Sequence, residues 1–159
     1  MRTIPFLSRF GTMRTETDFE EIYHKELARV YNFFRYRVED GQVAEDLTSE
    51  TFLKAWRNRH QYDRNLGAFS TWLYTIARRV ATDYFRKNRP VDPLDDFHHL
   101  PAESSTEELA QQNAEFSRLT FLLSRLADRD RELVALKYGA GLTNRTIARL
   151  TGLSESNVG

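Results

Sequence analysis

Apolar residues follow one another at intervals of three and four along most of this 159-residue chain. This spacing places them on one face of an α-helix, whereas a half-buried strand needs strict alternation. The pattern predicts helices over 18–38, 43–56, 70–89, 107–126 and 133–137. Ser70 is expected to cap the third helix, Pro90 to stop it, and Gly139 with Gly141 to end the fifth. The sequence therefore predicts an all-α protein.

Residues 90–106 separate the helices into two groups. The stretch from Pro90 to Ser117 has no Lys or Arg, and Pro90, Pro93 and Pro101 interrupt it. Such a segment cannot bury enough apolar surface to fold alone. We therefore expect two small helical domains, 18–89 and 107–159, joined by a flexible acidic linker, and a disordered leader over 1–17.

Composition excludes several classes of function. There is no cysteine for a disulfide, a thiolate metal site or a thiol nucleophile, and this fits the cytoplasm. No apolar run approaches the roughly 20 residues of a membrane span. No phosphate-binding loop or nucleophile motif occurs, so we expect neither enzyme activity nor a cofactor. Four residues of the linker could be imagined as metal ligands, but a flexible segment does not fix their geometry, and we expect no metal site: Asp95, Asp96, His98 and His99.

The C-terminal residues 143–159 have the spacing of a helix-turn-helix. Ala148 is small where two helices would cross, and Gly152 supplies the permissive backbone of the turn. In such a unit the residues that begin the second helix face DNA base edges in the major groove: Glu155, Ser156 and Asn157. The chain stops within that helix, so we expect a truncated unit. An ordinary helical hairpin is the alternative.

The predicted helix 70–89 combines cations with aromatic rings on a face that we place away from its apolar stripe. The residues of this face are Tyr74, Arg78, Thr82, Phe85, Arg86 and Arg89. Arginines neutralise phosphates and exposed rings stack on unpaired bases, so the combination suits single-stranded nucleic acid. The alternative is a solvated charged face whose rings pack in the core.

Three segments together resemble the sigma factors of bacterial RNA polymerase, and specifically their extracytoplasmic-function (ECF) group. Residues 46–57 (DLTSETFLKAWR) resemble the segment that docks on the clamp helices of the β′ subunit. Residues 69–86 (FSTWLYTIARRVATDYFR) resemble the segment that recognises and melts the minus-ten promoter element. Residues 126–159 are similar to the domain that reads the minus-thirty-five element.

The resemblance implies a protein that binds core RNA polymerase, directs it to promoters and promotes strand opening. It implies partners in the β′ clamp helices, the β flap, promoter DNA and an anti-sigma factor. The implied polymerase contacts are Asp46, Glu50, Phe52 and Trp56. The two aromatic residues could instead belong to the core, because they also lie on an apolar stripe. The implied minus-ten contacts are Tyr74, Arg78, Arg79, Arg86, Lys87 and Arg89. The loop 60–67 would hold a flipped base, and the linker would mimic nucleic acid or serve as a tether.

A transcription regulator with a ligand-binding N-terminal half and an operator-binding helix-turn-helix is the alternative from a different class. It accounts for residues 143–159 equally well. It does not account for residues 46–57 or for the basic aromatic helix. It also predicts binding to duplex DNA in the absence of polymerase.

Overall fold

The computed structural model describes residues 16–88 and 107–159, and every regular element within these ranges is a helix. This confirms the all-α prediction. The first group comprises α1 (Glu16–Arg37), α2 (Gly41–Arg57), the 3-10 turn η2 (Arg59–Gln61) and α3 (Phe69–Lys87). The second comprises α4 (Glu107–Ser124), α5 (Asp128–Val134), the π-helical turn η3 (Ala135–Gly139), α6 (Asn144–Thr151) and α7 (Glu155–Val158). The predicted linker lies outside the described residues.

Local chemistry fixes where the first helices begin. The Asp40 side chain accepts a hydrogen bond from the backbone N–H of Gln42 and caps α2. Ser70 does not cap α3 as predicted, because that helix already begins at Phe69 after an extended Ala68. The ring of Phe69 packs 5.5 Å from that of Trp72, centroid to centroid, which favours the earlier start.

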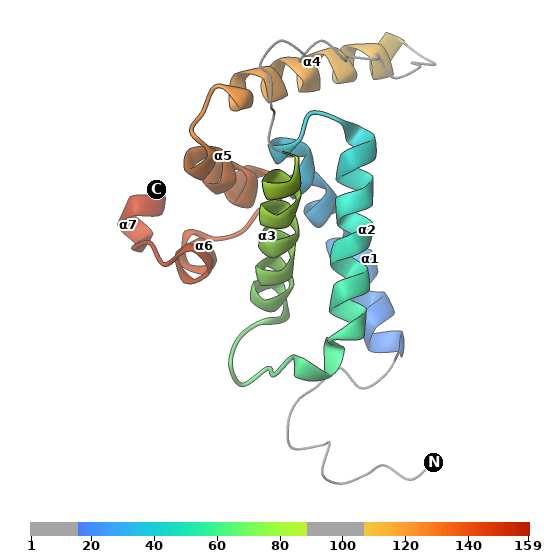
Figure 1. The fold of residues 1–159 in the computed structure, drawn as a ribbon, viewed down its shortest axis with the longest axis vertical. Helices are drawn as coiled ribbons and strands as arrows, with labels where there is room; N and C mark the ends of the chain where they lie inside the picture. Colours follow the sequence, from blue (N-terminus) through green and yellow to red (C-terminus); the bar gives the residue numbers. More distant parts are fainter. Residues whose placement is uncertain (1–15, 89–106) are drawn as a thin grey trace, which may run out of the picture.

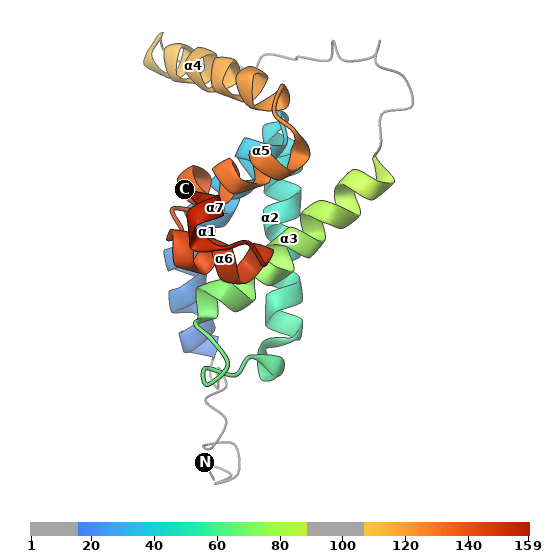
Figure 2. The same cartoon turned by 90° about the vertical axis from the view of Figure 1, so that its left-hand side faces the viewer.

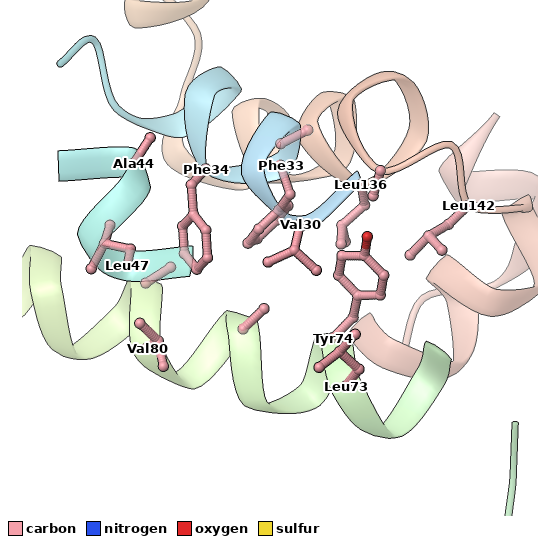
Figure 3. Packing of buried hydrophobic residues seen from close by; sticks show 14 of the residues in the cluster. Val30, Phe33, Phe34, Ala44, Leu47, Leu73, Tyr74, Val80, Leu136 and Leu142 are labelled. Atoms are coloured by element: carbon pink, nitrogen blue, oxygen red, sulfur yellow. The ribbon is translucent and has the colours of Figure 1, made fainter. Parts of the chain in front are cut away.

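The core of the first half lies where α1, α2 and α3 meet, as Figure 3 shows from close by. Its central side chains are buried completely or almost so because they recur at helical spacing on the facing sides of the three helices. They include Val30, Phe33, Phe34, Ala44, Leu47, Leu73, Ala77 and Val80.

The second half packs against the first through the same buried cluster. Leu136 and Leu142 lie beside Tyr74 and Phe33 (Figure 3), and Ile147 of α6 belongs to the cluster as well. Gly139 does more than end a helix, because a Cβ atom there would lie 2.9 Å from the backbone oxygen of Asn32. Turn η3 therefore meets α1 backbone to backbone, and only glycine permits that approach.

Helices α5, α6 and α7 lie on one side of α3, and α2 lies on the other (Figures 1 and 2). Helix α4 extends across the end of the molecule, where the Phe116 ring packs against Tyr36 and beneath the guanidinium of Arg35. None of the described helices is long and apolar enough to cross a membrane.

Candidate nucleic-acid and partner interfaces

The outward face of α2 carries two exposed carboxylates one helical turn apart. Asp46 accepts a hydrogen bond from Gln42 at 3.2 Å, and Glu50 forms an ion pair with Lys54 at 2.9 Å. Both acids remain open to solvent, and the exposed apolar side chain of Leu53 follows them. This face can therefore offer negative charge and apolar surface to a partner.

Phe52 and Trp56 take different positions in the structure. The sequence alone allowed either residue to contact a partner or to pack in the core. Phe52 is buried, with its ring 4.9 Å from that of Tyr23, so it belongs to the core and is not available to a partner. Trp56 is only partly buried, beside Phe19 and beneath the guanidinium of Arg59 at 3.8 Å. Only Trp56 of the two reaches the surface.

The buried position of Tyr74 removes this residue from the predicted basic and aromatic face of α3. The residue is fully buried, with its ring 5.9 Å from that of Phe33, and it cannot stack on a base. It precedes Ala77 and Ala81 by three and seven residues, so it lies on the same buried side of α3. Burial and the nearby carboxylate of Glu26 raise the pKa of its phenol well above the ordinary value.

The cations of α3 lie in two different environments. Arg79, Arg86 and Lys87 are exposed, and Arg86 pairs with Asp83 at 2.7 Å. Arg78 instead faces the second half of the chain and donates to both carboxylate oxygens of Glu132, at 2.6 and 3.4 Å, and to the backbone oxygen of Leu150. Arg89 lies outside the described residues.

Glu132 and Arg37 form a buried charge cluster with Arg78 that the sequence reasoning did not find. Arg37 approaches Glu132 at 3.7 Å, and their side chains are only 10% and 16% exposed. Burial lowers the pKa of the Arg37 guanidinium, and the carboxylates of Glu132 and Asp128 oppose that change. A cation three residues after Phe34, on the apolar stripe of α1, was the available signal for a buried partner.

The loop between η2 and α3 is held from within and presents one apolar side chain. The Tyr62 hydroxyl donates to the backbone oxygen of Gly67, and Asp63 accepts from the N–H of Asn65. Leu66 is 88% exposed. Next to it in the chain, the rings of Tyr62, Phe69 and Trp72 pack together with centroids 5.3 to 5.6 Å apart. The loop can therefore offer an apolar surface to an unstacked base.

The C-terminal segment forms the predicted helix-turn-helix. Gly152 ends α6 in the left-handed conformation with φ +77°, and Ser154 caps α7 by accepting from the N–H of Asn157. Glu155, Ser156 and Asn157 are exposed, and Glu155 pairs with Arg145 of α6 at 3.3 Å. An open hollow of about 440 Å³ lies between the two helices.

The described part of the chain shows no side-chain cluster that suggests a metal centre. Among the described residues, no group of three or more His, Asp or Glu side chains is placed to hold a metal ion. The linker residues Asp95, Asp96, His98 and His99 lie outside these ranges.

Comparison with known proteins gives a match in each half. The family model Sigma-70 region 2 matches residues 22–91, and Sigma-70, region 4 matches residues 116–159. Over 139 aligned residues the chain is 32% identical to the ECF RNA polymerase sigma factor SigM of Bacillus subtilis. The aligned region covers 87% of this chain and 84% of SigM. It is also 28% identical over 140 aligned residues to the ECF RNA polymerase sigma factor RpoE of Cereibacter sphaeroides, and this region covers 88% of this chain and 77% of RpoE.

Two solved structures share the fold. CnrH in complex with the cytosolic domain of CnrY matches with a TM-score of 0.69 and 19% identity, over 91% of this chain and 79% of that one. The sigma factor RpoE of Bartonella quintana, in complex with the anti-sigma factor NepR, matches with a TM-score of 0.67 and 20% identity, over 89% and 88%. At these identities the likeness supports the helical arrangement.

Proposed function

Since this chain belongs to the ECF sigma factors, which direct RNA polymerase to promoters and catalyse no reaction, we propose that three separate surfaces carry that activity. The first is the acidic face of α2, which docks on the polymerase. The second is the basic side of α3 with the loop before it, which holds the opened minus-ten element. The third is the start of α7, which reads the minus-thirty-five element.

The polymerase surface is the one that the geometry supports best. Asp46 and Glu50 are exposed side by side on α2, with Trp56 at the end of the same helix. Phe52 contributes from beneath, by fixing α2 against Tyr23. Charged pairs at the edge of an interface guide association and set its register, which suits docking on the β′ clamp helices.

The minus-ten surface combines phosphate contacts with a place for a base. Arg79, Arg86 and Lys87 are exposed along α3, and Arg89 would extend the row beyond the described residues. Arg78 joins them once its acceptors in the second half release it. The loop that presents Leu66 is held against an aromatic cluster, which suits the capture of a flipped base.

The minus-thirty-five surface rests on the helix-turn-helix. Glu155, Ser156 and Asn157 occupy the first turn of α7, where a helix that enters the major groove meets base edges. Arg145 and Arg149 line the hollow beside them and can contact the phosphate backbone.

The remaining assignments concern the whole protein. We assign residues 18–89 and 107–159 to two domains, with 90–106 as the linker. Both solved relatives were captured with a partner protein, an anti-sigma factor in the case of RpoE, and this chain would bind such a regulator too. It would act in the cytoplasm, alongside the polymerase and its β flap.

Binding to purified core RNA polymerase tests the first surface. Asp46→Ala with Glu50→Ala should raise the Kd for core by about tenfold, because both carboxylates of the docking face are lost. Glu20→Ala with Glu21→Ala removes two exposed carboxylates from α1 and serves as the charge-matched control. An equal effect of both pairs would contradict the α2 surface. A wild-type chain that ignores core and binds duplex DNA alone would favour the operator-binding regulator.

A further inference from the structure

Three large apolar side chains that remain exposed gather at the C-terminal end of α4. Phe121 and Leu122 are 57% and 53% exposed, and Leu126 follows at 40%. Arg118 and Arg125 are exposed beside them, and the guanidinium of Arg125 lies over the Phe121 ring, 5.3 Å from its centroid. Helix α4 therefore presents basic and apolar surface together, on the side away from its contact with α1.

The charge of this face changes sign along α4. Glu107 and Glu115 are exposed in the first half of the helix, whereas Arg118 and Arg125 lie in its second half or just after it. Steps of eight, three and seven residues place these four side chains on one side of the helix. The apolar patch thus lies at the basic end of a face that begins acidic.

The outward face of α2 has the same order of charge and its own exposed apolar residue. The carboxylates of Asp46 and Glu50 come first, Leu53 follows at 47% exposed, and Arg57 ends the helix. Steps of four, three and four residues again place these side chains on one face. Two helices with this order of charge oppose unlike charges when they run antiparallel.

An antiparallel pairing of α2 with α4 also brings apolar surface together. When Leu53 lies against Leu122, Glu50 lies opposite Arg125, and the basic end of α2 approaches the acidic half of α4. Two copies of α4 do not share this property, because bringing their apolar ends together also brings their arginines together. The complement of the α4 face is therefore the face of α2.

The two faces do not meet within one molecule. Helix α4 lies across one end of the protein, whereas α2 runs along its length (Figures 1 and 2), and the side chains of both faces are exposed. The formal net charge of the chain is zero, so no overall charge repulsion opposes an approach of two copies. The faces can meet only between molecules.

We propose that this protein associates with itself, through α2 of one molecule and α4 of a second, with Leu53 packed against Phe121 and Leu122. The exposed apolar area on each side is small, so the contact is weak and reversible. The contact rests on charge and exposure alone. Its consequence rests on the proposed docking of α2 on polymerase: a second copy and core polymerase compete for the same face, and molecules in excess over core are held in a reversible store.

Sedimentation of charge-reversed variants tests this contact. The wild-type chain should associate in proportion to its concentration at low ionic strength and dissociate in about 0.5 M NaCl, because exposed charges are then screened. Glu50→Lys and Arg125→Glu should each raise the dissociation constant about tenfold. An equimolar mixture of the two variants should associate like the wild type, because the mixed contact restores opposite charges. Glu21→Lys changes an exposed carboxylate of α1, and it should neither weaken self-association nor rescue Arg125→Glu.

The apolar part of the contact has its own variant. Leu122→Ala leaves every charge in place and should raise the dissociation constant about threefold. A wild-type chain that stays monomeric up to about 1 mM refutes self-association. Association that the mixture of Glu50→Lys with Arg125→Glu fails to restore refutes the pairing of α2 with α4. Binding of the wild type to core polymerase, measured at concentrations below the onset of self-association, tests the proposed function independently of these results.

Discussion

At the scale of single residues, the phenol of Tyr74 places an uncompensated polar group in the core. Its hydroxyl oxygen is buried and has no hydrogen-bond partner among the described residues. A buried hydroxyl that loses its bond to water costs about 1–3 kcal/mol. The carboxylate of Glu26 lies close enough to raise the pKa of this phenol further, so the neutral form is strongly favoured in the folded chain.

Tyr74→Phe should therefore leave the free energy of unfolding unchanged or raise it by about 1 kcal/mol at neutral pH, because the unpaired hydroxyl disappears. The raised folded pKa adds a pH effect. Ionisation of the unfolded phenol near its ordinary pKa of 10.0 favours unfolding as the pH rises above that value. Between about pH 9 and about pH 11, urea denaturation should show a smaller loss of stability for Tyr74→Phe than for the wild type.

Tyr138 provides the control for this experiment because its side chain is 70% exposed. Tyr138→Phe should reproduce the wild-type stability and the wild-type pH dependence. Tyr62 and Tyr84, whose pKa values burial also raises, remain in every variant and contribute equally to all of them. A Tyr74→Phe chain that loses stability as steeply as the wild type would contradict the assignment.

At the scale of elements, the orientation of α7 depends on the backbone of one glycine. Gly152 has φ +77°, in a region that residues with a Cβ atom rarely adopt, and nothing lies within 4 Å of the position of an added Cβ. Gly152→Ala should therefore lower the free energy of unfolding by about 1–2 kcal/mol through conformational strain alone. Gly67 has the same open surroundings and no positive φ, so Gly67→Ala should cost little or nothing.

Urea denaturation of the two glycine variants measures that difference. Hydrogen exchange would then show whether the loss is concentrated in α6 and α7, as expected for a local turn. Equal destabilisation by both substitutions would contradict the assignment of the loss to the positive φ of Gly152, because Gly67 has no positive φ.

Local pattern predicted the elements better than it predicted their partners. The spacing of apolar residues and the small residues Ala148 and Gly152 indicated the helices and the turn, because such features depend on neighbours within one helical turn or two. Asp46 and Glu50 were singled out only through the resemblance to sigma factors, and both are exposed. Tyr74 was placed on the wrong face of α3. Because it precedes Arg78 by four residues, it was assigned to the exposed basic face, whereas it lies on the buried face with Ala77 and Ala81.

The pairing of the two halves had no local signal. Arg131 and Tyr36 are 95 residues apart, and the partners of Arg78 lie 54 and 72 residues away. Periodicity within one segment reports which face is buried but not which distant segment covers it. Gly139 was predicted only to end a helix, because its contact with α1 also depends on a distant segment. A glycine can either end a helix or permit close backbone packing, and the local sequence does not distinguish the two.

At the scale of the whole molecule, a shared core should make the two halves unfold together. Ala135, Leu136, Ala140 and Ile147 of the second half are buried in one cluster with Phe33 and its neighbours on α1 and α3. Surface that is buried only while both halves are folded couples their stabilities. The shared core therefore predicts a thermodynamic link between the two halves.

Two probes in different halves can measure this link during urea denaturation. Both tryptophans, Trp56 and Trp72, lie in the first half, and a fluorophore on Ser156→Cys reports on the second. The two signals should follow the same transition in the wild-type chain. In Gly139→Ala the label should respond at a lower urea concentration than the tryptophans, because the second half loses its support on α1. Gly67→Ala should keep the two transitions coincident. Separate transitions in the wild-type chain would mean that each half is stable on its own and that the shared core contributes little to the stability of either half.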